Sequence, residues 1–88
     1  MFDLCGKLAF VTGSSRGIGK AVAIKLAQAG ADVIVHGRSN SDALKDTAMQ
    51  IGKLGRKAYT VWGDMSYVDQ INEIFERIKE QFGYIDIM

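Results

Sequence analysis

The sequence predicts an α/β fold in which a parallel sheet is covered by helices on both faces, a doubly wound arrangement. Two observations lead to this prediction. Short apolar runs alternate with amphipathic segments in the order β-α-β-α-β-α-β along the 88 residues. A glycine-rich segment, residues 12–19, separates the first apolar run from the first amphipathic one. Helical connections of this kind are the crossovers that parallel neighbouring strands require.

The first strand is expected over Leu8–Thr12, a short apolar run without alternation, as in strands that are covered on both faces. The first helix is expected over Ile18–Ala29, with Gly30 at its C-terminal end. Its apolar residues are three or four positions apart and form one stripe, made by Ile18, Val22, Leu26 and Ala29.

The second strand is expected over Asp32–His36, which is β-branched in its middle. The second helix is expected to follow an N-cap at Ser41 and to reach Leu54, with Gly55 ending it. Three residues within this helix are poor helix formers, namely Asp46, Thr47 and Gly52.

The third strand is expected over Lys57–Trp62. Ser66 and Asp69 resemble a capping box in front of a third helix, which Gly83 ends. Ile85–Met88 has the pattern of the opening of a fourth strand. We therefore expect residues 1–88 to form one incomplete domain, with no second domain.

The composition is that of a globular protein, because 48% of the residues are hydrophobic and 11 basic residues nearly balance 10 acidic ones. No basic stripe indicates nucleic-acid binding. The sequence shows neither a signal-peptide h-region nor an apolar run near the ~20 residues of a membrane span. Its single cysteine, Cys5, fits a reducing compartment. These observations favour a cytoplasmic protein that binds neither nucleic acid nor membranes.

The segment Thr12-Gly13-Ser14-Ser15-Arg16-Gly17-Ile18-Gly19 has the chemistry of a phosphate-binding turn. Glycines let the backbone turn sharply and approach a ligand where a Cβ would clash. The helix N-terminus that follows offers unpaired N–H groups and a partial positive charge to an anion. The sequence therefore predicts an anionic ligand at this turn.

The spacing Gly-x-x-x-Gly-x-Gly after Thr12 resembles the short-chain dehydrogenase/reductase family and differs from the G-x-G-x-x-G of other dinucleotide-binding folds. The resemblance covers the whole chain but only the N-terminal portion of the family's Rossmann-type domain. Within the family, the sequence looks most like the 3-oxoacyl carrier-protein reductases. Three further features match the family, namely Gly6-Lys7, Gly63-Asp64-Met65 and the run Tyr84–Met88, which looks like the lead-in to an Asn-Asn-Ala-Gly motif.

The resemblance implies a dinucleotide site. Asp64 is implied to lie near the adenine ring, although an aspartate at this position also favours the N-terminus of the third helix. The residues implied to bind the cofactor are Gly13, Ser14, Ser15, Arg16, Gly17, Ile18, Gly19, Arg38, Ser39, Asp64 and Met65.

The residues after the second strand favour NADP(H) over NAD(H). Dinucleotide folds that prefer NAD place an acidic residue ~20 positions past the glycine turn, where it binds the ribose 2′-hydroxyl. Residues 36–41 contain no carboxylate, whereas Arg38 and Ser39 offer a guanidinium and a hydroxyl to a 2′-phosphate. Arg16 is a second cation, as in NADP-preferring members of the resembled family. The alternative is that both arginines are solvated surface residues.

His36 ends a strand that we expect to be buried, and such a histidine is usually bonded locally; a contact with the adenosine is the alternative. One histidine and one cysteine at unrelated positions make no metal site. Trp62, Phe75 and Phe82 are expected in the core rather than stacked on a cofactor.

The resembled family interconverts a carbonyl and a secondary alcohol with a Tyr-x-x-x-Lys pair, a serine and an asparagine. This sequence contains no Tyr-x-x-x-Lys, so no catalytic residue is assigned and the 88-residue chain is expected to be inactive alone. We therefore expect the cofactor-binding N-terminal portion of an NADP(H)-dependent oxidoreductase. The alternatives are a stand-alone dinucleotide-binding module and a non-catalytic truncated remnant.

An incomplete sheet leaves a strand edge and apolar helix faces without partners. The chain alone is therefore expected to be marginally stable or to self-associate through these surfaces.

Overall fold

The computed structural model describes residues 4–15, 17–83 and 85, and its strands form one parallel sheet. The strands lie in the order β1-β2-β3, so β2 is the central strand. The register pairs Leu8 with Asp32 and Val33 with Ala58. The elements are β1 (Leu8–Val11), α1 (Gly17–Gln28), β2 (Asp32–Gly37), α2 (Asp42–Lys53), β3 (Ala58–Trp62) and α3 (Val68–Phe82).

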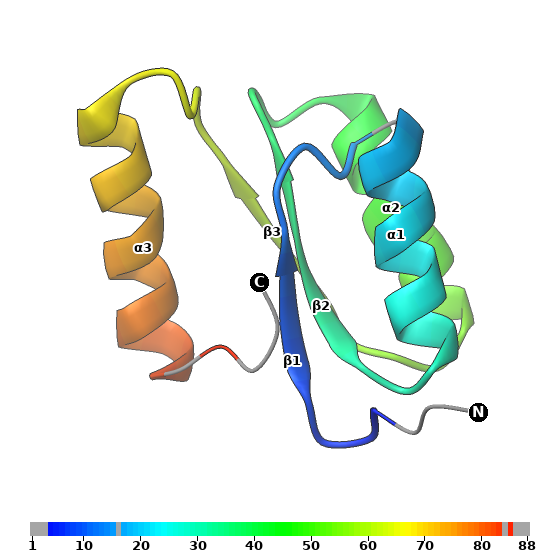
Figure 1. Ribbon diagram of the computed structural model, residues 1–88. Helices are drawn as coiled ribbons and strands as arrows, with labels where there is room; N and C mark the ends of the chain where they lie inside the picture. The colour runs from blue at the N-terminus through cyan, green and yellow to red at the C-terminus, as the bar shows by residue number, and fades with distance from the viewer. Residues whose placement is uncertain (1–3, 16, 84, 86–88) are drawn as a thin grey trace.

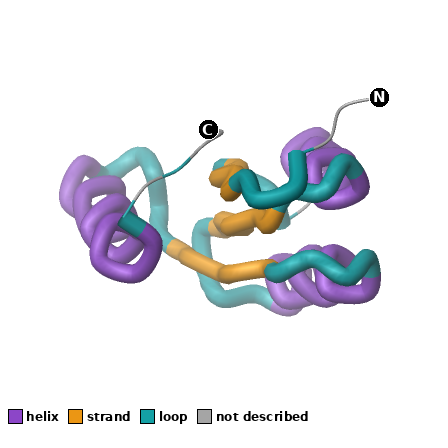
Figure 2. The backbone as a smooth tube through the Cα atoms, turned by 90° about the horizontal axis from the view of Figure 1, so that it is seen from below, coloured by secondary structure: helices purple, strands orange, loops and turns teal. Residues whose placement is uncertain are grey.

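Helices α1 and α2 cover one face of the sheet, and α3 covers the other (Figures 1 and 2). Strand β2 contributes to both faces because its side chains alternate. Val33 and Val35 pack under α1 and α2, and Ile34 packs under α3. All three are fully buried, as expected for a central parallel strand. The predicted doubly wound α/β arrangement is confirmed.

Of the apolar stripe predicted for the first helix, Leu26 packs against the core, whereas Ile18 and Val22 lie on the outer side of α1. The buried residues of α1 are Ala23 and Ala27, whose small side chains let the helix lie close to β1 and β2. Ile18 is 85% exposed and Val22 is 44% exposed. The spacing predicted the helix correctly, but the bulk of its side chains did not indicate which side faces the sheet.

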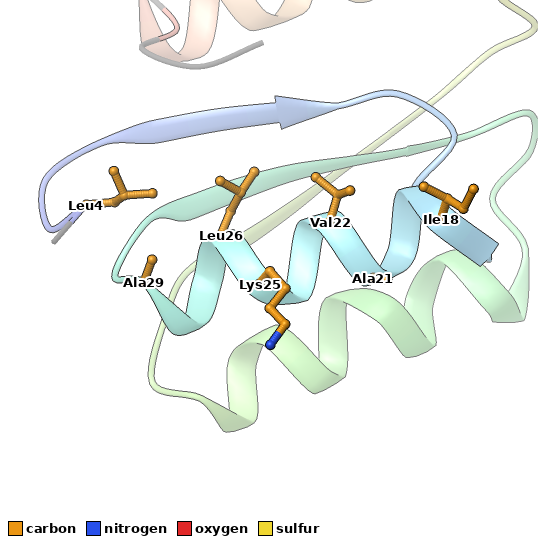
Figure 3. Close-up of a pocket in the computed structure, with 7 residues that line it drawn as sticks. All are labelled: Leu4, Ile18, Ala21, Val22, Lys25, Leu26 and Ala29. Atoms are coloured by element: carbon orange, nitrogen blue, oxygen red, sulfur yellow. The ribbon is translucent and has the colours of Figure 1, made fainter. Parts of the chain in front are cut away.

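A shallow apolar groove of about 510 Å³ runs along this outer side of α1. Figure 3 shows its walls, in which Lys25 is the one charged side chain. The groove is lined by Leu4, Ile18, Ala21, Val22, Lys25, Leu26 and Ala29.

The predicted N-cap of the second helix is confirmed, and that of the third is wrong. The Ser41 hydroxyl accepts a hydrogen bond from the Leu44 N–H at 3.2 Å, and α2 begins at the next residue. Helix α3 instead follows Tyr67, which makes no side-chain cap bond. The Ser66 N–H and hydroxyl both donate to the Asp64 carboxylate, at 2.9 and 2.7 Å. The Ser66 hydroxyl is therefore engaged in a local turn with Asp64 and does not cap the helix.

The prediction that Trp62 lies in the core is wrong. Trp62 is the last residue of β3 and is 42% exposed, because β3 pairs on one edge only among the described residues. Phe75 and Phe82 pack against the core on the α3 side, as predicted. Ile85 packs there too, whereas the rest of the predicted fourth strand lies outside the described residues.

Candidate functional site

The turn between β1 and α1 lies at the carboxyl edge of the sheet, beside the ends of β2 and β3 (Figure 1). Gly13 and Gly17 have φ angles of 62° and 65°, in the left-handed region that side chains disfavour. Within the described chain, no atom lies within 4 Å of where a Cβ on either would stand. The turn therefore presents bare backbone in front of a helix N-terminus, which is the arrangement that binds anions.

Gly19 is required for a different reason, which is the packing of α1 on the turn. A Cβ at this position would lie 2.2 Å from the Gly13 carbonyl oxygen and 2.8 Å from its carbon. Because both atoms belong to the backbone, they cannot move aside as a flexible side chain would. Only glycine therefore lets the first turn of α1 approach the loop this closely.

The turn is fixed to the end of β2 by Ser14 and His36. The Ser14 N–H donates to the His36 carbonyl at 2.8 Å, and the His36 N–H donates to the Ser14 hydroxyl at 2.8 Å. Ser14 is fully buried, and its polar groups are engaged with β2. Its contribution to a phosphate site is therefore to position the turn, not to contact a ligand with its side chain.

Helix α2 contacts the turn and α1 through two of the residues that disfavour helix formation. The buried Thr47 hydroxyl lies 3.3 Å from the Ser15 carbonyl and 3.1 Å from the Ala43 carbonyl, so it is placed to donate to either. Asp46 forms an ion pair of 3.0 Å with Lys20 of α1. The Lys20 ammonium, followed by the Gln50 amide, lowers the pKa of the Asp46 carboxyl below its usual range. Thr47 and Asp46 therefore make contacts outside α2 that compensate for their low helix propensity.

A cavity of about 500 Å³ lies between the turn and the end of β2. It brings together four of the predicted cofactor residues, which are Gly13, Ser15, Arg38 and Ser39. Sequence reasoning considered His36 as an alternative contact of the adenosine and did not assign Gly37 or Ser41 to the site, although the serine of an N-cap and the last residue of a parallel strand are signals that can be read from sequence. The lining residues are Gly13, Ser15, His36, Gly37, Arg38, Ser39 and Ser41.

Asp64, after β3, reaches the same site through Arg38. Its carboxylate lies 3.3 Å from the Arg38 guanidinium, whose side chain is 82% exposed. The second carboxylate oxygen accepts both bonds from Ser66, and the Asp64 N–H donates to the side chain of Gln70. The Ser66 hydroxyl and then its N–H lower the pKa of the Asp64 carboxyl; partial burial opposes this, and Arg38 adds a smaller effect. The loop after β3 is therefore an ordered anionic partner of Arg38.

The remaining predicted cofactor residues lie away from the cavity or outside the described chain. Met65 packs against the core on the α3 side. Ile18 lines the apolar groove of α1. Arg16 is not among the described residues, so its predicted contact with a cofactor stays a prediction.

The His36 ring is hydrogen-bonded to nearby backbone groups, which confirms the first of the two alternatives predicted for it. Its ring lies edge-on to Phe10, with centroids 6.4 Å apart, and both ring nitrogens have backbone partners. Across residues 4–15, 17–83 and 85, no three side chains of His, Cys, Asp or Glu are grouped as a metal site would need. None of the described helices is long and apolar enough to cross a membrane.

Comparison with known proteins identifies the family to which this geometry belongs. The family model described as short chain dehydrogenase matches residues 7–88. The chain belongs to the short-chain dehydrogenase family. This membership agrees with the glycine spacing, the parallel sheet and the cavity at its carboxyl edge.

Two similar curated proteins are a reductase-like protein and a reductase by name. The hydroxynaphthalene reductase-like protein Arp2 of Metarhizium acridum is 38% identical over 86 residues, which are 98% of this chain and 32% of the relative. Versicolorin reductase stcU of Emericella nidulans is 36% identical over 87 residues, or 99% of this chain and 33% of the relative. The chain spans about a third of the length of these relatives.

Solved structures of the family have the same fold. A short-chain type dehydrogenase/reductase from Mycobacterium marinum is 44% identical, with a TM-score of 0.88 over 97% of this chain and 34% of that one. A metagenomic short-chain oxidoreductase, solved in complex with NADP, is 34% identical, with a TM-score of 0.89 over 96% of this chain and 38% of that one.

The carboxyl of Asp64 provides a test of the loop after β3. Because its pKa is lowered in the folded chain, its contribution to stability is present at neutral pH and is lost as the pH falls from the ordinary aspartate pKa through the lowered one. We expect Ser66→Ala to raise the pKa of Asp64 more than Arg38→Ala does, as measured by carboxyl ¹³C NMR titration. Ser39→Ala, which removes a hydroxyl from the cavity but no described bond to Asp64, is the control. A larger effect of Arg38→Ala on the pKa of Asp64 would contradict the assignment of Ser66 as the main cause of the lowered pKa.

Proposed function

We propose that the chain is the cofactor-binding N-terminal portion of an oxidoreductase that uses NADP(H) to interconvert a carbonyl and a secondary alcohol. The observation that carries the proposal is the bare glycine turn at a helix N-terminus, opening onto a cavity that contains an arginine. Family membership supports the same reaction class. A nicotinamide cofactor bound in this site would supply or accept the hydride.

The residues present fit a dinucleotide. The left-handed backbone at Gly13 and Gly17 leaves the space of two absent side chains open to a pyrophosphate. The N-terminus of α1 carries the partial positive charge that stabilises such an anion. Arg38 and Ser39 line the same cavity as Gly13. An adenosine ribose next to a pyrophosphate at the turn would lie beside them.

The wall of the cavity favours a 2′-phosphorylated cofactor. The Arg38 side chain lines the cavity and is largely exposed, and a guanidinium binds phosphate through paired hydrogen bonds. The lining contains no carboxylate that would accept the hydrogen bond of a free ribose 2′-hydroxyl. Asp64 is bonded to Ser66 and pairs with Arg38, so its charge helps to position the guanidinium beside the cavity. NADP(H) is therefore the proposed cofactor, in preference to NAD(H).

Catalysis is proposed for a longer protein and not for these 88 residues. Proton transfer to a carbonyl oxygen requires a positioned acid, and the sequence has no Tyr-x-x-x-Lys to provide it. A stand-alone dinucleotide-binding module remains the second proposal, since the contacts described for the glycine turn come from β2 and α2 of this chain. The resemblance to 3-oxoacyl carrier-protein reductases and the cytoplasmic location stay predictions.

The first prediction from this proposal concerns the turn. We expect NADPH to change the fluorescence of the half-exposed Trp62, and Gly17→Asp to weaken binding more than about tenfold, because it adds a negative charge and a strained left-handed residue. Gly55→Asp is the matched control, since Gly55 also has a positive φ of 81° and open space around it but lies after α2. Binding that survives Gly17→Asp would contradict the assignment of the phosphate site.

The second prediction concerns the choice of cofactor. We expect Arg38→Ala to weaken NADPH binding about tenfold or more, because a charged hydrogen bond to phosphate is lost, and to change NADH binding little. Arg77→Ala is the control, because Arg77 lies on α3, where it pairs with Glu73. Equal losses for the two cofactors on titration of Arg38→Ala would argue against a 2′-phosphate site.

We further propose that the chain associates with other copies of itself through the apolar groove of α1 or through an open sheet edge. Ile18 and Val22 expose branched apolar side chains side by side along the groove (Figure 3). Strand β3 pairs with β2 alone among the described strands, which leaves its other edge without a described partner. Surfaces of both kinds favour association between chains.

The groove can be tested by adding one charge to it. We expect the chain to sediment as a species larger than a monomer and Val22→Glu to shift it toward the monomer. Met49→Glu is the matched control, because Met49 is an exposed apolar residue of α2 outside the groove. A monodisperse monomer for the unmodified chain would contradict self-association, and equal effects of both variants would exclude the groove as the contact.

A further inference from the structure

His36 connects two loops at the carboxyl edge of the sheet, and the first of them borders the cavity. Its Nδ1 atom accepts a hydrogen bond from the Gly13 N–H at 3.0 Å, and its Nε2 atom lies 2.8 Å from the Gly63 carbonyl oxygen. Gly13 belongs to the glycine turn after β1, and Gly63 follows β3 directly. The imidazole therefore links the loop after β1 to the loop after β3, at the carboxyl end of the strand β2 that carries it.

These partners determine the protonation of the ring. Since Gly13 offers a donor, Nδ1 has to be the unprotonated acceptor. The Gly63 carbonyl is an acceptor, so Nε2 carries the proton and donates it. A doubly protonated ring would set an N–H at Nδ1 against the Gly13 N–H, and one of these contacts would be lost. Only the neutral ring with its proton on Nε2 satisfies both loops.

The surroundings hold the ring in this position. His36 is only 3% exposed, and its backbone is bonded to Ser14 through both N–H and carbonyl. The next residue, Gly37, accepts a hydrogen bond from the Gly63 N–H at 3.0 Å. The side-chain bridge therefore rests on a backbone that is itself fixed to both loops.

The charged groups around the ring are few. Arg38 shares the cavity with it, and Asp64, next to Gly63, pairs with that arginine. On the α3 side, Glu73 and Arg77 line a neighbouring cavity of about 220 Å³ with Gly63 and form an ion pair with each other. The ring itself is bonded to backbone groups and packs edge-on against Phe10.

We propose that His36 is a positioning residue for dinucleotide binding, which sets the spacing between the glycine turn and the segment Gly63–Asp64 and does so only as a neutral imidazole. The inference rests on the proposed dinucleotide site, because the two loops it joins are those that would contact the pyrophosphate and the adenosine. Protonation of the ring releases the glycine turn and weakens cofactor binding.

The test is NADPH titration of the 88-residue chain and three variants, followed by Trp62 fluorescence. His36→Phe keeps a ring against Phe10 but removes both bonds, and we expect NADPH binding about tenfold weaker. His36→Asn keeps an acceptor near the position of Nδ1 and should recover part of this loss. Val61→Ala is the matched control, because Val61 lies beside His36 in the sheet and is buried, but makes no bond to either loop through its side chain. It should lower thermal stability and leave NADPH affinity within about twofold.

The pH dependence separates positioning from mere stability. As the pH is lowered, the unmodified chain should lose more NADPH affinity than His36→Asn does, because only an imidazole can take up a second proton at the nitrogen that accepts from Gly13. The phosphates of NADPH titrate equally in both titrations, so the difference belongs to the imidazole. Long-range ¹H–¹⁵N NMR at the highest pH of the titration should find Nδ1 unprotonated and Nε2 protonated.

The outcomes are distinct. Superimposed pH profiles, the opposite tautomer, or equal losses in Val61→Ala and His36→Phe would overturn the positioning role while leaving the dinucleotide site intact. If His36→Phe does not fold, the comparison with His36→Asn across pH decides the same question. A chain that binds no NADPH at any pH would overturn the proposed function and this inference together.

Discussion

The contact between the first turn of α1 and the glycine turn constrains the rest of the structure. With no Cβ at Gly19, α1 starts directly against the Gly13 carbonyl, and the helix axis then passes close over β1 and β2. Ala23 and Ala27 continue this close approach along the helix. A larger residue at any of these positions would lift α1 from the sheet and open the core that Val33 and Val35 share with α2.

The same contact determines where the polar groups of the turn can go. The N–H groups of Gly13 and Ser14 bond to His36, and the Ser15 carbonyl accepts from Thr47. The buried part of the turn is thus satisfied by β2 and α2, as buried polar groups have to be. What remains for a ligand is the outer side of the loop and the helix N-terminus behind it.

Sequence reasoning predicted the order of the described elements and the glycine turn between the first strand and the first helix, because these depend on local patterns. Glycine spacing, β-branched runs and helical periodicity each act within a few residues. It failed at two positions. Ser66 bonds to Asp64, two residues before it, instead of capping a helix, and Trp62 at the end of β3 is 42% exposed. The role of His36 could not be read either, since its partners Gly13 and Gly63 are both more than twenty residues away.

The parallel pairing of the strands has a consequence for how the chain folds. Leu8 pairs with Asp32 and Val33 with Ala58, so each strand contacts a partner about 25 residues further on. Neither ladder can close until a whole helix has been made and has crossed the sheet. During synthesis, β1 therefore leaves the ribosome well before β2 exists to cover it, and its apolar run stays open to other chains in that interval. The crossovers that gather three loops at one edge of the sheet make this a slow-folding topology, in which the time needed to synthesise α1 and β2 governs how long β1 is exposed.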